Sequence, residues 1–145
     1  MVKNILGFFN EYEFLSNFYH SPFNFCGTTF LTNEHFFQAA KATNIDDFLE
    51  VVSRSTPREA KISGRKIICR PDWHSIKINV MSMGLRLKFQ DPELREKLLA
   101  TENWYLEETN TWNDTFWGVC NNVGYNYLGN LLMDLRTQIR KEEML

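Results

Sequence analysis

Helix start signals and apolar residues at helical spacing recur from residue 32 to the end of the chain. The clearest start is Thr56-Pro57-Arg58-Glu59, which combines a hydroxyl N-cap, a proline at the first helical position and a Glu at the third. Gly64 is placed to end that helix about two turns later. Helices are expected over about 32–43, from 44 or 46 to 52, over 57–64, from 73 to 87, from 92 onward and from about 126 onward.

Strand signals are confined to the first part of the chain. Phe23-Asn24-Phe25 and Thr28-Thr29-Phe30 flank Cys26-Gly27, which predicts a small hairpin. The stretch from Trp104 to Tyr125 is polar and aromatic and has no helical period, and loops of that length are commonly functional. The expected fold is therefore mainly α: one compact helical domain over residues 1–145 with a small N-terminal β hairpin.

Charge and composition limit the class of ligand. The 145 residues carry a formal net charge of -2, whereas proteins that follow a long phosphate backbone carry a basic excess. Aromatic residues make up 14% of the chain, more than a core of this size needs, so some of them are expected to line a site. A pocket for a single nucleotide remains compatible with both observations.

The cysteines and the apolar segments predict where the protein resides. Cys26, Cys69 and Cys120 are odd in number and lack C-x-x-C spacing, which indicates neither a disulfide framework nor a zinc site. The chain has no run of 18 apolar residues and no small-residue cleavage site near its N-terminus. We expect a cytoplasmic protein without membrane association.

A polar stripe on the first expected helix is the leading candidate for chemistry. At about 100° per residue, Glu34, Gln38 and Lys41 share one face, so an acid, an amide and an amine lie together. Phe36 and Ala39 are among the apolar residues that occupy much of the remaining circumference. The stripe is either a solvent-facing surface or the wall of a pocket, and spacing alone favours the surface.

Two further features allow both functional and structural interpretations. Asp114 lies between Trp112 and Trp117, where apolar surroundings would raise its pKa and the indoles could stack on a heteroaromatic ring; an Asx turn explains it equally well. Trp73 is either a third aromatic wall or ordinary core. Gly129, inside the last helix, indicates a close approach to its backbone, by a phosphate or by packing.

Several motifs in collinear order resemble the NADAR family, which contains the YbiA-like N-glycosidases. They are Phe14-Leu15-Ser16-Asn17-Phe18-Tyr19, Glu34-His35-Phe36-Phe37-Gln38-Ala39-Ala40-Lys41, Trp73 with Val80-Met81 and Lys88-Phe89, Trp117-Gly118, and Asn126-Tyr127-Leu128-Gly129-Asn130-Leu131-Leu132-Met133-Asp134-Leu135-Arg136. The resemblance covers nearly the whole chain.

The resemblance implies a mainly α, YbiA-like fold and hydrolysis of N-glycosidic bonds without metal or other cofactor. Two activities are implied. One cleaves ribosylaminopyrimidine phosphates, intermediates of riboflavin synthesis, and the other removes ADP-ribose from guanine in DNA or RNA. The expected partner is therefore a phosphoribosyl or ADP-ribosyl compound, small or attached to nucleic acid. The competing class is a non-catalytic module that binds ADP-ribose or NAD.

The resemblance also implies the site residues. Glu34, Lys41 and Asp114 are the expected catalytic residues. Residues expected to bind substrate are Asn17, Gln38, Trp73, Glu108, Trp117, Gly118 and Asn126, with Glu107 as the alternative to Glu108. Arg65 and Lys88 are further candidates for binding phosphate, which no family motif implies.

Two reaction schemes use these residues. In one, Glu34 activates water or stabilises an oxocarbenium-like centre while Asp114 manages the proton of the leaving amine. In the other, Lys41 is a nucleophile that captures the sugar as a Schiff base.

Overall fold

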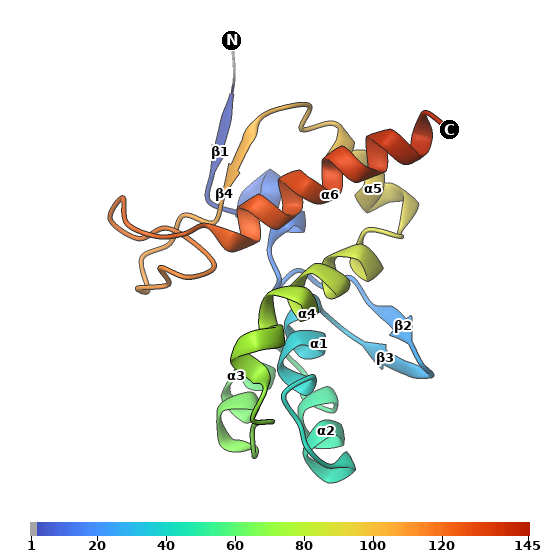
Figure 1. The fold of residues 1–145 in the computed structure, drawn as a ribbon, viewed down its shortest axis with the longest axis vertical. Helices are drawn as coiled ribbons and strands as arrows, with labels where there is room; N and C mark the ends of the chain where they lie inside the picture. The colour runs from blue at the N-terminus through green and yellow to red at the C-terminus, as the bar shows by residue number, and fades with distance from the viewer. Residues whose placement is uncertain (1–2) are drawn as a thin grey trace. The chain divides into compact units, whose positions relative to one another are not determined.

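The computed structural model describes residues 3–145, and its secondary structure is mainly helical (Figure 1). Contacts within the chain divide it into two units, one of residues 17–88 and one of residues 3–16 with 89–145. No helix among residues 3–145 is long and apolar enough to cross a membrane.

The unit of residues 17–88 begins with two short strands and continues with four helices. Strands β2 (Phe23–Phe25) and β3 (Thr28–Phe30) pair antiparallel across the turn at Cys26 and Gly27, which both have positive φ. The helices are α1 (Asn33–Ala39), α2 (Ile45–Val52), α3 (Pro57–Lys66) and α4 (Trp73–Lys88). All four correspond to helices predicted from the sequence.

The starts of these helices follow the predicted caps. Thr32, Asn44 and Thr56 each accept a hydrogen bond from the backbone N–H three residues later, and Pro57 stands at the start of α3. These caps satisfy amide groups that the first helical turn leaves without an intrahelical partner. The predicted starts are therefore confirmed.

Two predicted helix ends are wrong. Helix α1 stops at Ala39 instead of near residue 43, because Ala42 leaves the helix to form a bridge with Cys69. Helix α3 runs through Gly64 to Lys66. Gly64 is needed inside the helix because an added Cβ would lie 2.1 Å from Oε1 of Gln38, so this glycine allows α3 to approach α1.

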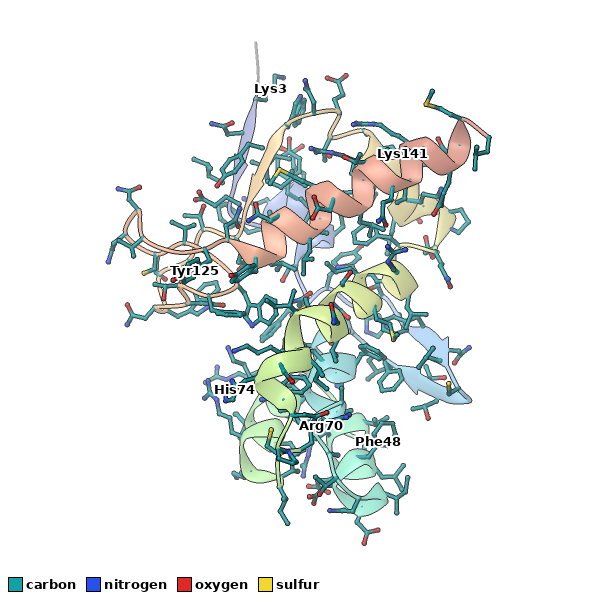
Figure 2. The ribbon with its side chains drawn as sticks, in the orientation of Figure 1. Lys3, Phe48, Arg70, His74, Tyr125 and Lys141 are labelled. Carbon is teal, nitrogen blue, oxygen red and sulfur yellow. The ribbon has the colours of Figure 1, made fainter. Side chains whose placement is uncertain are left out.

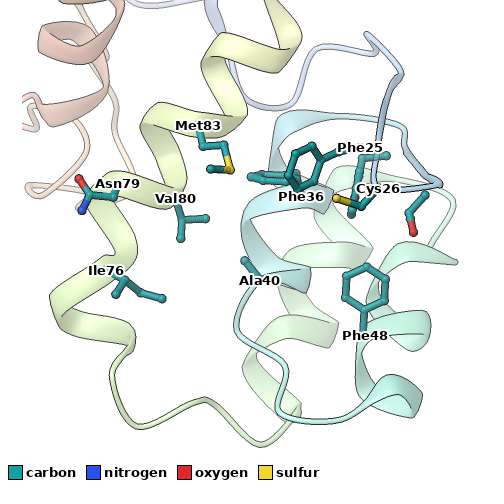
Figure 3. A pocket seen from close by; sticks show the side chains of 11 residues that line it. Phe25, Cys26, Phe36, Ala40, Phe48, Ile76, Asn79, Val80 and Met83 are labelled. Carbon is teal, nitrogen blue, oxygen red and sulfur yellow. The ribbon is translucent and has the colours of Figure 1, made fainter.

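An aromatic cluster forms the core of this unit. The rings of Phe30 and Phe36 meet edge to face with centroids 5.2 Å apart, and Phe23 and Phe48 pack against the same cluster. Beside it lies a cavity of about 450 Å³ between the hairpin, α1, α2 and α4 (Figure 3). Ile76, Val80 and Met83 of α4 line the cavity, and Val80 and Leu87 also pack against the aromatic cluster. The buried side of α4 is formed by Trp73, Met81, Gly84, Leu85 and Lys88.

His35 is fully buried on α1 and connects it to the end of α2. The Thr32 hydroxyl donates to Nδ1 over 2.8 Å, and Nε2–H donates to the Arg54 carbonyl over 2.9 Å. Burial lowers the pKa of His35 below its ordinary value of 6.5, and the nearby His20 lowers it further. The folded protein therefore holds His35 neutral.

Because the pKa of His35 is lowered in the folded protein, we expect the protein to lose stability in mild acid. Below about pH 6.5 the unfolded chain binds a proton at His35 that the folded chain does not, so the melting temperature should fall as the pH is lowered through this range. In His35→Gln that fall should be smaller, while the exposed His74→Gln control should follow the wild type. Thermal denaturation at several pH values measures this. If the melting temperature depends on pH equally in all three proteins, His35 is not the cause of the loss of stability.

The other unit combines a parallel strand pair with two helices. Strand β1 (Asn4–Leu6) pairs with β4 (Tyr105–Glu107), and Ile5 lies opposite Leu106. The 3-10 helix η1 (Asn10–Leu15) follows β1, while α5 (Pro92–Leu99) and α6 (Tyr127–Glu143) supply most of the helical residues. Leu94, Leu98, Leu128, Leu132, Leu135 and Ile139 are buried, as the spacing predicts.

Candidate active site

Glu34 and Gln38 form the start of the polar stripe on α1. Both side chains are buried, with 7% and 4% of their surface exposed, and Nε2 of Gln38 donates to Oε1 of Glu34 over 2.8 Å. The backbone N–H of Glu34 donates to the carbonyl of Asn17 over 3.1 Å. Because a solvent-facing stripe would leave these side chains exposed, the structure favours a buried polar site over a surface.

Lys41 lies two residues beyond the end of α1, so it belongs to a turn and not to the helix. Its N–H donates to the Gln38 carbonyl over 3.2 Å, and its own carbonyl accepts from the N–H of Arg70 over 2.8 Å. Arg70 lies just before α4 (Figure 2). These two backbone bonds hold Lys41 between α1 and α4, at the end of the polar stripe.

The amine of Lys41 is half-buried, and its pKa is lowered from the ordinary value of 10.5. Desolvation is the main cause. The charges of Cys69 and Glu34 raise this pKa, whereas those of Arg65 and Lys61 lower it further. Lys41 makes no ion pair with any carboxylate between residues 3 and 145. The amine is therefore more available as a neutral nucleophile than a solvated lysine is.

Trp73 forms an aromatic wall beside this amine. Nζ of Lys41 lies 5.8 Å from the centroid of the Trp73 ring, and the Phe37 ring packs on Trp73 with centroids 4.9 Å apart. Only 6% of Trp73 is exposed. Trp73 therefore borders the site and also serves as core, which combines the two interpretations that the sequence allowed.

Asn17 lies next to Glu34 in a buried network of amides. Its Oδ1 accepts from Nδ2 of Asn33 over 2.9 Å, and its Nδ2 contacts Sδ of Met81 at 3.3 Å. Asn33 was missed from the sequence because an Asn in a first helical turn has many ordinary explanations. The contacts of Asn17 give it a structural role, and sugar binding by this residue stays a prediction.

The loop residues gather separately in the other unit. Asn110 organises the loop: its Oδ1 accepts from the N–H groups of Trp112 and Asp114, and its Nδ2 donates to the Asp114 carbonyl over 2.8 Å. Oδ1 of Asp114 in turn accepts from the N–H groups of Phe116 and Trp117 over 3.1 and 2.9 Å. The predicted Asx turn at Asp114 is thus present.

The two candidate loop acids differ in their surroundings. Glu107, on β4, accepts from the hydroxyls of Tyr105 and Thr109 over 3.0 and 2.5 Å. The Glu108 side chain is half-buried and packs against Gly118, where an added Cβ would lie 2.1 Å from the Glu108 carbonyl oxygen. Gly118 therefore lets the loop close on the residue that follows β4.

Asn126 has a structural role that the sequence did not indicate. It stands at the N-cap position of α6, yet its side chain makes no capping bond. Instead its Nδ2 donates to the Leu106 carbonyl over 2.9 Å, and its Oδ1 accepts from the N–H of Glu108 over 3.0 Å. The amide thereby fastens β4 to the start of α6, and substrate binding by Asn126 stays a prediction.

Trp117 is half-buried in an aromatic group at the start of α6. Its ring meets that of Phe116 edge to face, with centroids 4.7 Å apart. The ring centroids of Phe116 and Tyr127 are also 4.7 Å apart. Tyr125, just before α6, stacks on Tyr127 (Figure 2). Base stacking on Trp117 stays a prediction.

The surroundings of Gly129 explain why α6 contains a glycine. An added Cβ would lie 2.1 Å from the Leu106 carbonyl oxygen and 2.5 Å from the Asn126 side chain, so packing against β4 is the close approach that the sequence indicated. Gly129→Ala should lower the free energy of unfolding by about 1–3 kcal/mol, the cost of overpacking, although Ala is the better helix former by about 1 kcal/mol. Denaturant unfolding measures this, with the exposed Asp134→Ala on the same helix as control. A Gly129→Ala protein as stable as that control would disprove the close approach.

This chain is similar to known proteins in both sequence and structure. The structure matches the NMR structure of the Escherichia coli protein YbiA with a TM-score of 0.89 and 38% identity, covering 99% of this chain and 89% of that one. The sequence is 40% identical to N-glycosidase YbiA of Escherichia coli strain K12, over 99% of this chain and 93% of the relative. It is also 37% identical to the chloroplastic riboflavin biosynthesis protein PYRR of Zea mays, over 77% of this chain and 20% of that protein.

Together, fold and site define a mainly helical protein with a buried acid and amide leading to a lysine of lowered pKa. The NADAR domain model matches residues 7–140, nearly the whole chain. The chain belongs to the NADAR domain family, as its motifs suggested, and relatives that it matches over nearly full length are named N-glycosidases.

Proposed function

We propose that this protein is an N-glycosidase that releases a phosphorylated ribose from an amine of a heteroaromatic base, with Glu34 and Lys41 as catalytic residues. The observation that carries the proposal is the half-buried Lys41 amine of lowered pKa at the end of the Glu34–Gln38 stripe. The names of its relatives support the reaction class. We also propose that the chain acts as one NADAR domain, since the family match runs from residue 7 to residue 140.

The lowered pKa of Lys41 favours the covalent scheme, because a lysine that only oriented the substrate would work best when fully charged. An amine-linked ribose opens to an imine at C1. The neutral Nζ adds to C1, the leaving nitrogen takes up a proton, and the bond from C1 to that nitrogen breaks. Water then adds to the Lys41 imine and releases the sugar as its aldehyde.

Glu34 supplies the negative charge that this scheme needs. Positive charge develops at C1 and on the imine nitrogen, and a carboxylate in a buried setting stabilises such charge more strongly than one in water. Gln38 fixes the carboxylate by its 2.8 Å hydrogen bond. In the alternative scheme the same carboxylate activates water directly, and Lys41 only orients the sugar.

Two substrates separate the possible activities. The protein is incubated with ribosylaminouracil 5'-phosphate and, separately, with ADP-ribosylated guanine in DNA, and release of sugar is followed by mass spectrometry. We expect release from the pyrimidine compound, which the riboflavin name of the maize relative favours. Release from the guanine adduct alone would assign the other activity. Binding of ADP-ribose without release from either would support the non-catalytic module and overturn the proposal.

Asp114 is proposed to manage the proton of the leaving amine, as the family motif implies. Asp114→Asn keeps the oxygen that accepts the two loop N–H groups, whereas Asp114→Ala removes it. We therefore expect Asp114→Asn to keep its melting temperature and substrate affinity but to lose single-turnover rate, and Asp114→Ala to lose stability as well, by about 1 kcal/mol or more. If Asp114→Asn turns over normally, the only role of Asp114 is structural, in the Asx turn of the loop.

A further inference from the structure

Two cations on α3 act on the charge of Lys41 and have no acidic partner among the described residues. Lys61 and Arg65 are four residues apart, so they share one face of the helix. Both act on Lys41 strongly enough to lower its pKa. Neither side chain forms an ion pair or hydrogen bond with any residue between 3 and 145, whereas the side chains of Arg54 and Arg70 in the same unit each pair with a carboxylate.

The packing of α3 on α1 brings these cations to the polar stripe. Gly64 lies directly against the Gln38 side chain, where no Cβ would fit. Lys61 and Arg65 flank Gly64 in sequence and lie on one side of it around the helix. The two cations therefore lie at one side of the α3 face that meets Gln38, with Lys61 half-buried and Arg65 exposed, and Gln38 itself bonds to Glu34.

Positive charge gathers at this end of the stripe. Lys61 and Arg65 both act on the Lys41 amine, while Glu34 and the Cys69 thiol act on it in the opposite sense. Cations that lie this close repel one another unless an anion joins them. A doubly charged oxyanion suits this arrangement, because the guanidinium of arginine binds two oxygens at once and the lysine adds a third charged contact.

We propose that Lys61 and Arg65 form an oxyanion subsite that binds the phosphate ester of the sugar, next to the stripe of Glu34, Gln38 and Lys41. This inference rests on the proposed N-glycosidase function and adds the group by which the substrate is held. It makes the enzyme selective for phosphorylated over unphosphorylated ribosylamines. An ordinary interpretation exists for Arg65 alone, since a cation in the last turn of a helix stabilises its dipole. That interpretation applies equally to Lys66, which provides a matched control.

The experiment compares Lys61→Gln, Arg65→Gln and the double variant with Lys66→Gln. With ribosylaminouracil 5'-phosphate, each site variant should raise KM by about tenfold, the effect of losing one charge-assisted hydrogen bond, and the double variant by more. With the same compound lacking the phosphate, the KM of every variant should equal that of the wild type. Lys66→Gln should match the wild type with both compounds. Unchanged KM in the double variant would overturn the subsite.

Inorganic phosphate tests the subsite without relying on turnover. Titrated phosphate should raise the melting temperature of the wild type and of Lys66→Gln, and the rise should be lost in the double variant. If neither substrate is hydrolysed, the proposed function has failed and this titration alone decides the subsite. A phosphate effect that is absent from the wild type, or equal in wild type and double variant, would contradict it.

Discussion

Glu34→Gln is expected to lower N-glycosidase turnover by on the order of a hundredfold and to leave the melting temperature unchanged. The amide keeps the shape of the side chain, and its oxygen can still accept the 2.8 Å hydrogen bond from Gln38. Only the negative charge is lost, and that charge is what the developing positive charge at C1 requires. Single-turnover kinetics and thermal denaturation on the same preparation measure both quantities.

The control for this variant is Glu96→Gln, an exposed acid on α5 that forms no ion pair with the described residues. It should retain full turnover. If Glu34→Gln keeps turnover within a few-fold of the wild type and is equally stable, Glu34 has no electrostatic role in the reaction.

Lys41→Arg is expected to lose activity by about 10³-fold or more, because arginine keeps the positive charge but forms no imine at accessible pH. The pH profile gives a second signature. The neutral amine is the reactive form, so turnover by the wild type should rise with pH and level off below the ordinary lysine pKa of 10.5, since burial lowers the Lys41 pKa.

Lys141→Arg, an exposed substitution on α6, is the matched control and should behave as the wild type. An active Lys41→Arg enzyme would assign Lys41 an orienting role and favour direct attack by water.

Features that depend on neighbouring residues could be predicted from the sequence. The caps at Thr32, Thr56 and Asp91 satisfy amides within three residues, so the starts of α1, α3 and α5 follow from local sequence. The spacing of Glu34 and Gln38 likewise predicted a shared face, and the two side chains hydrogen-bond there. These interactions require no knowledge of distant contacts.

Features set by distant contacts could not be predicted. Strands β1 and β4 pair across about a hundred residues of chain. Each strand has only three residues, which is too short for a periodic signal in the sequence. Lys41 leaves α1 because Ala42 bridges to Cys69, and Gly64 continues α3 because it faces Gln38. Lys61 was missed for the same reason: only the packing of α3 on α1 brings it to the stripe.

Borohydride trapping tests most directly the claim that Lys41 reacts with the sugar. Reductant added during turnover of ribosylaminouracil 5'-phosphate converts an imine to a stable secondary amine, and peptide mass spectrometry then locates the modified residue. We expect a reduced phosphosugar adduct on Lys41 in the wild type and none in Lys41→Arg. The yield of the adduct should be higher when the reductant is added early in turnover, while substrate remains. Continued turnover with no adduct on Lys41, or an adduct on another residue, would contradict that claim.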